Sequence, residues 1–421
     1  MDRFLKLPAV ERTEQTTGEQ GYVFFQFIRP AFAQAFARCW IFVAGAFCLW
    51  DLLRHTKVGL TDGAGQPFGG DFLNYWSGAM LAWRGTAAEV YDWNAFHAFQ
   101  ESAVGGTLDF YHYSYPPVLL LLTAPLAALP YIPALIAWTV SGWYCFYRAL
   151  RLAMPGGGAL LFSIATPALF VNALGGQNGA WTAALFGGGL SLLNRRPMIA
   201  GVLLGLLIYK PQIGVLLPIA LLAGRQWKAL AAAAVTAVGL ILISGLIFGL
   251  EIWADYFRNL TILREAILEN GSGVWHRMVS VFVFARHLGA DVETAYLVQG
   301  ITALLTAAVV AYVWSRDIPA GIRNAILMLG TCLVTPYLQD YDLVVSAFVV
   351  VWLAVDCDHS TAGKLAAQLS LLVLLMPFVA SLLANITGLA LGPLFIVPAF
   401  VAAARLSLAK RHDALLPSRS S

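Results

Sequence analysis

Residues 195–222 read RRPMIAGVLLGLLIYKPQIGVLLPIALL, and this stretch decides which kind of fold the chain adopts. Two apolar segments of about thirteen residues each, 197–209 and 211–223, follow the paired arginines and flank Lys210. A helix needs about 20 apolar residues to cross a bilayer, so neither segment spans it alone. Because a charge at membrane depth is costly and is mainly functional, we expect two short helices that bring Lys210 below the surface, facing a cavity. The alternative is a loop lysine whose ammonium group extends to water.

The composition of the whole chain agrees with this interpretation. Of the 421 residues, 59% are hydrophobic and only 12% are charged, whereas a soluble domain carries about 25% charged residues. The apolar runs do not alternate with polar residues, so helices are expected rather than barrel strands. We predict an all-α polytopic membrane protein with about 12 to 13 apolar helices. The expected apolar segments are residues 33–53, 116–130, 131–150, 158–174, 177–193, 197–209, 211–223, 227–250, 291–315, 320–337, 341–356, 364–384 and 390–405.

Lysines and arginines predict the orientation, because short cytoplasmic loops are enriched in them. If the basic turns are cytoplasmic, two large loops at about 54–115 and 251–289 are external, the first with helical patterns near 72–84 and 92–103. Segments 116–130 and 131–150 must then cross the membrane only once between them, on a path broken by prolines. The basic residues are Arg148, Arg151, Arg195, Arg196, Arg225, Lys228, Arg316, Arg323, Lys364, Arg405, Lys410 and Arg411.

The expected domains are a cytoplasmic segment at 1–30, a single membrane domain at 31–405 and a cytoplasmic tail at 406–421. The five cysteines lie mostly in apolar segments and form no C-x-x-C pair, so we interpret them as buried small hydrophobes. No basic run indicates a nucleic-acid partner, and no spacing of His, Asp and Glu indicates a metal site. The cysteines are Cys39, Cys48, Cys145, Cys332 and Cys357.

The first external loop opens with Gly69-Gly70-Asp71-Phe72-Leu73-Asn74-Tyr75-Trp76, which is the best candidate for chemistry. The glycines permit a tight turn, and Tyr75 and Trp76 suit a membrane interface. An acid at that position is a candidate catalytic base. The alternative is equally open from the sequence, because Asp71 precedes a helical pattern and could cap that helix.

Other polar residues at the external ends of the segments are candidates for binding. Lys210, Arg277 and His276 are candidates for an anionic phosphate. Each has a structural alternative, namely a helix cap for the amides and Asp342, an aromatic belt for the tyrosines, and a solvated helix for His276 and Arg277. The candidates for sugar or acceptor contacts are Tyr75, Tyr113, Tyr115, Gln177, Asn178, Gln212, Tyr341 and Asp342.

Five stretches together resemble glycosyltransferase family 87, a family of membrane enzymes with the GT-C architecture that use polyprenyl-phosphate sugars. They occur in the family's order and cover most of residues 69–345. They are GGDFLNYWSGAMLAWRGTAAEVYD, YSYPPVLLLLTAPLAALP, NALGGQNGAWTAAL, the run from Arg195 quoted above, and TPYLQDYDLVV.

The resemblance implies a transferase that acts on the outer face of a bacterial inner membrane. The family's loop acid corresponds to Asp71 as general base, and Lys210 would lie near the donor phosphate. The expected donor is a polyprenyl-phosphate hexose, with mannose as the typical sugar, and the acceptor is a glycolipid or glycan. Transfer would be a single displacement with inversion. No cofactor is predicted, although a divalent metal ion stays open, and the rival function is a transporter or flippase of lipid-linked sugars.

Overall fold

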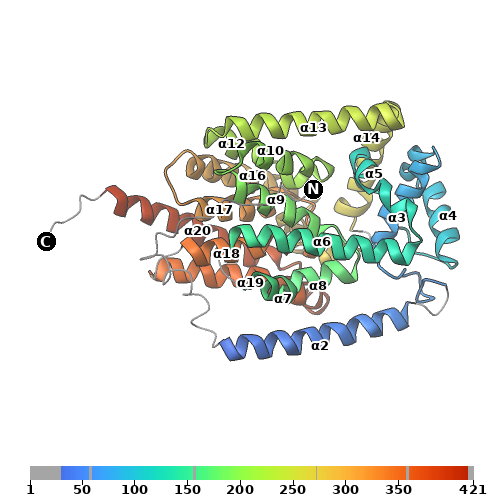
Figure 1. Cartoon of the computed structure of the whole chain (residues 1–421), viewed down its shortest axis with the longest axis horizontal. Helices are drawn as coiled ribbons and strands as arrows, with labels where there is room; N and C mark the ends of the chain where they lie inside the picture. The colour runs from blue at the N-terminus through green and yellow to red at the C-terminus, as the bar shows by residue number, and fades with distance from the viewer. Residues whose placement is uncertain (1–29, 56–58, 155–157, 272, 357–359, 416–421) are drawn as a thin grey trace, which may run out of the picture.

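The computed structural model describes residues 30–55, 59–154, 158–271, 273–356 and 360–415, and these residues are predominantly helical, with no strand longer than an isolated bridge (Figure 1). The prediction of an all-α fold is therefore confirmed. Three described helices are long and apolar enough to span a membrane, namely α13, α16 and α19. The longest helices are α2 (Pro30–Arg54), α6 (Tyr131–Ala153), α13 (Trp227–Phe248), α16 (Val292–Trp314), α19 (Thr361–Thr387) and α20 (Gly392–Leu415).

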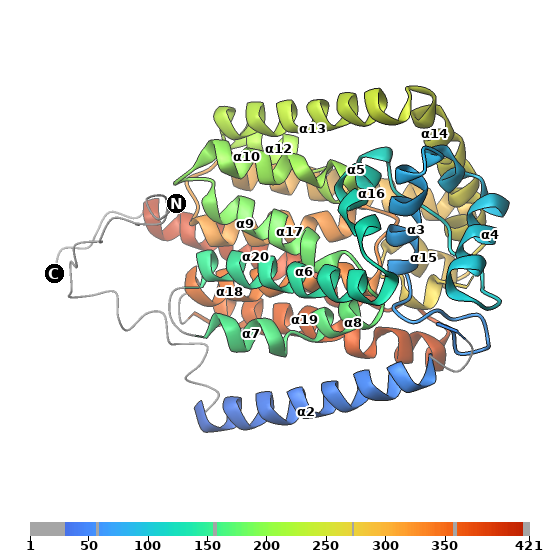
Figure 2. The ribbon, with the colours of Figure 1, turned by 45° about the vertical axis from the view of Figure 1, so that its right-hand side comes forward.

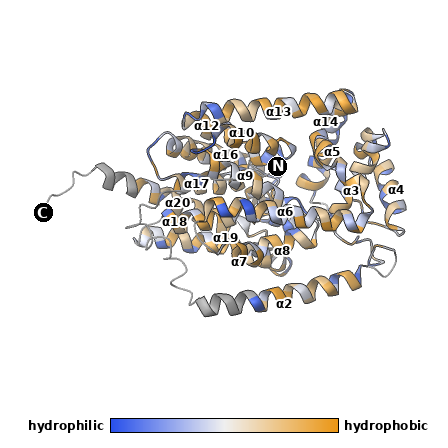
Figure 3. Cartoon of the chain, viewed as in Figure 1, coloured by the Kyte–Doolittle hydropathy of each residue, from blue (hydrophilic) through white to orange (hydrophobic). Residues whose placement is uncertain are grey.

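Apolar residues predominate in the helices of this bundle (Figure 3), and many of their side chains are exposed, as a bilayer requires. On α13, for example, Val235 is 74% exposed and Leu246 is 81% exposed. Aqueous solvent would make such a surface unfavourable by about 25 cal/mol for each Å² of apolar area. The chain is thus a polytopic membrane protein. Its long helices run side by side along the length of the bundle (Figure 2).

The ends of the bundle differ in what they carry. One end, here called the loop end, holds α3 (Phe72–Trp83), α4 (Trp93–Val104), α14 (Glu251–Leu263) and α15 (Val281–His287) (Figure 2). The helices expected near 72–84 and 92–103 are therefore confirmed as α3 and α4. The opposite end, here called the arginine end, is closed by turns in which Arg323 donates to Asn194 at 3.3 Å and Gly321 N–H donates to Asp356 at 2.6 Å.

Of the two apolar segments after the first loop, only the one that forms α6 runs from one end of the bundle to the other (Figure 2). The short helices α5 (Pro117–Thr123) and η3 (Ala124–Ala128) stay at the loop end, where the Trp76 indole N–H donates to Leu129 O at 3.0 Å. Helix α6 also begins there, because the Tyr131 hydroxyl donates to Phe68 O at 2.6 Å, and it ends at the arginine end with Arg151 in its last turn. Prolines at the starts of these helices permit the re-entrant path.

Helix α2 lies at the edge of the bundle and meets it through aromatic side chains. The ring of Trp40 lies 5.4 Å from that of Phe170 and 4.9 Å from that of Phe378. The interpretation of the cysteines as buried is wrong for Cys39 and Cys48, which are exposed, because most of α2 faces away from its neighbours. Cys145 is partly buried, Cys332 is buried, and Cys357 lies outside the described residues.

The structure describes the chain only in part at the two ends of the expected membrane domain. Helix α20 continues to Leu415, beyond the expected start of a tail at residue 406. Residues 1–29 and 416–421 lie outside the described part of the chain. The apolar part of this helix spans Gly392–Leu408, so the boundary expected at residue 406 stays a prediction.

The two short segments around Lys210 form a hairpin that starts and ends at the arginine end. It consists of α10 (Pro197–Leu206), η4 (Leu207–Tyr209), α11 (Pro211–Gly214) and α12 (Leu217–Ala223). Helix α10 packs tightly on α13 because Gly201 and Gly205 face the backbone carbonyls of Ala229 and Ala233. Small residues spaced four apart let membrane helices approach this closely.

We expect Gly201→Ala to destabilise the fold, because the new Cβ would collide with Ala229 O and must displace a backbone atom. Overpacking of this kind costs about 1–3 kcal/mol, measured as a lower unfolding midpoint in detergent. Gly239→Ala is the matched control. Gly239 lies on α13, the helix that Gly201 packs against, and has open space around it, so this variant should be neutral or slightly stabilising. Equal midpoints for the two variants would contradict the packing described here.

Candidate active site

A contact between two glycine turns positions the first external loop on the bundle. The Asp71 N–H donates to Gly175 O at 3.1 Å. A Cβ at Gly70 would lie 3.1 Å from Gly175 O, and one at Gly176 would collide with Gly69 O. Gly176 also has φ +57°, a conformation that glycine adopts without strain. The start of α3 is therefore seated directly on the turn between α8 (Pro167–Leu174) and α9 (Gly179–Leu192).

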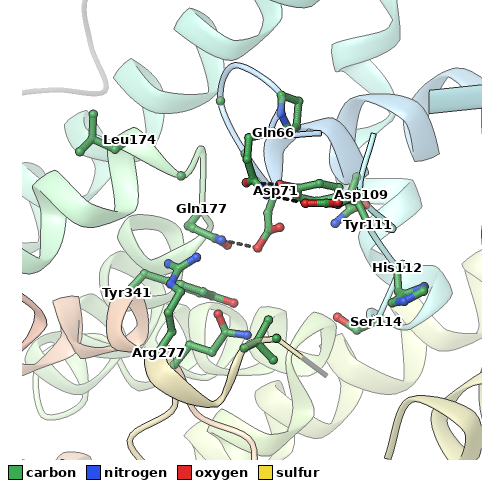
Figure 4. Close-up of a pocket in the computed structure, with 18 of the residues that line it drawn as sticks. Gln66, Asp71, Asp109, Tyr111, His112, Ser114, Leu174, Gln177, Arg277 and Tyr341 are labelled. Carbon is green, nitrogen blue, oxygen red and sulfur yellow. Dashed lines mark hydrogen bonds between the residues drawn. The ribbon is translucent and has the colours of Figure 1, made fainter. Parts of the chain in front are cut away.

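Asp71 occupies the cap position of α3, yet its side chain caps nothing. Its carboxylate instead accepts a hydrogen bond from Gln177 Nε2 and points into a cavity (Figure 4). Asp92 provides the contrast, because its carboxylate accepts from Asn94 N and Ala95 N at 3.0 Å each at the start of α4. The capping alternative therefore fits Asp92 and not Asp71.

Gln177 is itself fixed by a buried chain of hydroxyl groups. The Tyr75 hydroxyl donates to Gln177 Oε1 at 3.3 Å, and the hydroxyls of Tyr75 and Tyr115 lie 3.0 Å apart. These partners orient the amide, so that its NH₂ group faces Asp71. A carboxylate that accepts such a bond is held in one orientation at the cavity surface.

The cavity has a volume of about 730 Å³ and lies at the loop end. Its wall combines residues from the first loop, the turn after α8, the second loop and the segment before α18 (Ser346–Asp356), so segments far apart in sequence meet there. Six of the residues predicted from the sequence line it, namely Asp71, Tyr115, Gln177, His276, Arg277 and Tyr341.

Arg277 lines the cavity with a guanidinium group that is fixed by an acidic partner. Its Nη2 lies 3.0 Å from Asp340 Oδ1, and its Nε lies 3.3 Å from both carboxylate oxygens. Asp340 is almost fully buried, whereas the Arg277 side chain is 27% exposed. One edge of the guanidinium is thus fixed by Asp340, and the remaining N–H groups can meet a ligand.

His276 lies beside Arg277 in the short helix η6 (Trp275–Arg277). Burial, and then the neighbouring Arg277 cation, lower the pKa of His276 below its ordinary value. The imidazole is therefore neutral at pH 7, and it can donate or accept a hydrogen bond without adding charge.

Lys210 is buried, as expected, but it does not line the cavity. Its Nζ donates to Asn178 Oδ1 at 3.0 Å and to the Asp342 carboxylate, and lies 4.6 Å from the centre of the Tyr341 ring. The expectation that Lys210 faces a cavity is thus corrected, because Asp342 supplies its counter-charge inside the protein. A buried ammonium requires such a partner.

The helix η7 (Asp340–Val345) connects both charge pairs. Asp340 holds Arg277, Asp342 holds Lys210, and Tyr341 between them lines the cavity. Asp342 also accepts a hydrogen bond from Gln339 N at 3.2 Å, so the capping role considered for it is present as well.

The other predicted residues lie behind the wall or elsewhere. Tyr75, Tyr113 and Asn178 are buried and do not line the cavity. Gln212 in α11 is partly buried away from the cavity. Tyr113 packs among the aromatic rings of Tyr91 and Phe96 rather than facing a ligand.

A further stretch of the cavity wall is formed by residues 109–112 and Ser114 with Gln66, none of which was among the predicted site residues. This stretch is extended and has no periodicity, so only its polar and aromatic composition, within a loop already assigned to the site, could have indicated it. Among the described residues, no group of three or more His, Cys, Asp or Glu lies close enough to hold a metal ion.

Comparison with known proteins identifies the family of this chain. The model of glycosyltransferase family 87 matches residues 113–336, slightly more than half of the chain. That range contains Tyr115, Gln177, His276 and Arg277, and it begins after Asp71. Searches of curated proteins and of solved structures found no match. The chain therefore belongs to glycosyltransferase family 87 and is a membrane glycosyltransferase.

Proposed function

We propose that the protein transfers a hexose, with mannose as the expected sugar, from a polyprenyl-phosphate donor to a lipid or glycan acceptor. The family supplies the class of reaction. The observation that carries the rest is that the Asp71 carboxylate and the Arg277 guanidinium line one cavity from different sides (Figure 4). The Asp71 carboxylate can accept the proton of the acceptor hydroxyl. The Arg277 guanidinium can stabilise the negative charge of the leaving phosphate.

The mechanism is a single displacement with inversion. Asp71 takes the proton of an acceptor hydroxyl while that oxygen forms a bond to the anomeric carbon of the donor. The bond from that carbon to the phosphate oxygen breaks, and polyprenyl phosphate leaves with the electron pair. The hydrogen bond from Gln177 keeps the carboxylate oriented toward the cavity throughout.

The leaving phosphate gains negative charge, and Arg277 is placed to stabilise it. His276, which is neutral at pH 7, offers a hydrogen bond to the same phosphate rather than a charge. Lys210 does not line the cavity and acts on it indirectly. Its ammonium lies against the Tyr341 ring and pairs with Asp342, and so it holds both residues in place. The proposal needs no metal ion.

An apolar groove supports a donor that is attached to a lipid. It has a volume of about 290 Å³, lies between α2, α6 and α8, and is lined by side chains such as Trp40, Ala44, Leu169 and Ala173. Helix α8 borders both spaces, because its Val171 and Leu174 line the cavity. The groove would hold part of the isoprenoid chain while the phosphate reaches Arg277.

The orientation follows from the charge distribution. Arg151, Arg195, Arg225 and Arg316 lie in turns at the arginine end, which the positive-inside rule assigns to the cytoplasm. The cavity at the loop end would then face the outside of a bacterial inner membrane. A donor that has already been carried across the membrane would be used there.

We expect Asp71→Asn to reduce transfer by about 10²- to 10⁴-fold, because an amide cannot take the proton. The assay uses purified protein in lipid nanodiscs, radiolabelled polyprenyl-phosphate mannose and a membrane lipid extract as acceptor. Asp92→Ala is the matched control, since it removes a true cap, costs about 0.5–2 kcal/mol of stability and should spare the rate. Equal transfer by wild type and Asp71→Asn would remove Asp71 from the mechanism. Movement of the lipid without a new glycosidic bond would favour the flippase.

Arg277→Gln should lower kcat about 10²-fold or more, because the leaving phosphate loses its charge partner. It also leaves Asp340 buried and unpaired, so the double variant Arg277→Gln/Asp340→Asn is needed to restore stability. The double variant should regain the unfolding midpoint of wild type, while its kcat stays low. Arg258, which pairs with Asp255 outside the cavity, supplies the control Arg258→Gln. Recovery of the rate in the double variant would contradict a role in catalysis.

Ala44→Phe should raise the KM for a long-chain donor, because the ring would fill the groove between α2 and α8. A donor with a chain of one or two isoprene units would be affected much less. Gly45→Phe is the control, since no atom lies within 4 Å of a Cβ at that position. The same KM for both chain lengths in Ala44→Phe would place the lipid elsewhere.

A further inference from the structure

One wall of the cavity has no role in the mechanism above. It consists of Gln66, residues 109–112 and Ser114, and is here called the 109–114 wall. In Figure 4 Asp109, Tyr111, His112 and Ser114 lie on one side of Asp71, and Arg277 and Tyr341 lie on the other. In an inverting displacement the acceptor oxygen attacks from the side opposite the leaving phosphate. With the phosphate at Arg277, the acceptor must approach from the 109–114 wall.

The charges of this wall suit a neutral ligand. Asp109 places a carboxylate at the cavity, and the wall contains no lysine or arginine. Burial, and then the neighbouring His97, lower the pKa of His112 to about 4, so its ring is uncharged at pH 7. Asp71 and Asp109 would repel a second phosphate, whereas hydroxyl groups can donate to both carboxylates.

An exposed aromatic ring stands next to these polar groups. One face of Phe110 stacks on His97, with the ring centres 4.1 Å apart and the planes 14° from parallel, yet the side chain is 54% exposed. His112 in turn packs against Trp93 at 3.8 Å. The His112 ring also lies 5.8 Å from that of Phe110, 24° from parallel, and more than half of the Phe110 side chain stays exposed, so an aromatic ring is available to a ligand at the cavity wall.

The polar groups of the wall are already oriented. Gln66 Nε2 donates to Asp109 Oδ2 at 2.7 Å, and the Tyr111 hydroxyl donates to Gln66 Oε1 at 2.8 Å. The Ser114 hydroxyl points to the cavity and has no hydrogen bond within the described chain (Figure 4). A planar apolar ring beside fixed hydrogen-bonding groups matches a sugar, which has one face of C–H bonds and a rim of hydroxyls.

We propose that the 109–114 wall is an acceptor subsite that binds a sugar ring, with Phe110 stacking on its C–H face and Asp109, Gln66 and Ser114 meeting its hydroxyls. The acceptor is then a glycan or the sugar part of a glycolipid, and a simple lipid alcohol is excluded. This inference rests on the proposed function, because it takes Asp71 as the base and Arg277 as the phosphate site. It adds that the acceptor is recognised through a sugar ring and names the residues that select it.

The test compares Phe110→Leu, which keeps the apolar volume without a planar face, with Phe110→Trp, which keeps the plane. With labelled donor and an envelope glycolipid extract, Phe110→Leu should raise the KM for the acceptor by about tenfold or more. The KM for the donor and the slow transfer to water should not change. Phe110→Trp and the control Trp83→Leu, an exposed aromatic residue outside the cavity, should resemble wild type. Ser114→Ala, which removes no hydrogen bond within the described chain, should also raise the KM for the acceptor.

An unchanged acceptor KM in Phe110→Leu, or equal losses of transfer to acceptor and to water, would overturn the subsite. A binding experiment separates this failure from failure of the proposed function. Saturation-transfer NMR with methyl α-D-mannopyranoside should saturate the sugar C–H protons with wild type and Phe110→Trp, and not with Phe110→Leu. Binding without transfer would reject the donor and keep the subsite, whereas no Phe110-dependent binding would reject the subsite. Equal transfer to a free glycan and to a glycolipid would show that the sugar alone is recognised.

Discussion

The contact between the Gly69-Gly70 turn and the Gly175-Gly176 turn is the constraint on which the site depends. Two backbones meet there with no side chain between them, and a Cβ at Gly176 would separate them. The Asp71 N–H donates to Gly175 O, so a main-chain contact holds together the two turns that carry Asp71 and Gln177, and the side chains of these residues then bond to each other. The position of Asp71 is therefore fixed by the bundle, although this residue belongs to a loop by sequence.

The charges around the cavity are arranged so that few are left without a partner. Asp340 and Asp342, two residues apart in η7, hold Arg277 and Lys210 respectively. Removing two charges from water is costly, and a buried pair repays that cost only with good geometry and further hydrogen bonds. Asn178 supplies such a bond to Lys210. The pair then supports the Tyr341 ring, which faces the cavity.

The sequence predicted the helices well because the information is local. Lengths of apolar runs located α13, α16 and α19, and prolines indicated the broken path of residues 116–130. What it could not predict depends on distant partners. Lys210 was expected to face a ligand, but its partner Asp342 is 132 residues away in the chain. Tyr113 was expected in the site, but the packing of α3 and α4 encloses it.

Half-length helices explain how a polar cavity fits within this apolar bundle. The hairpin of α10 to α12 enters from the arginine end and turns at Lys210, while α5 enters from the loop end and turns back. Neither piece completes the crossing, so polar groups at the tips are enclosed by protein rather than by lipid, as membrane depth requires. A cavity at the loop end can therefore hold water and hydroxyls, while the groove beside α2 stays apolar. Separate polar and apolar spaces joined at α8 are what a donor with a charged phosphate and a hydrocarbon chain needs.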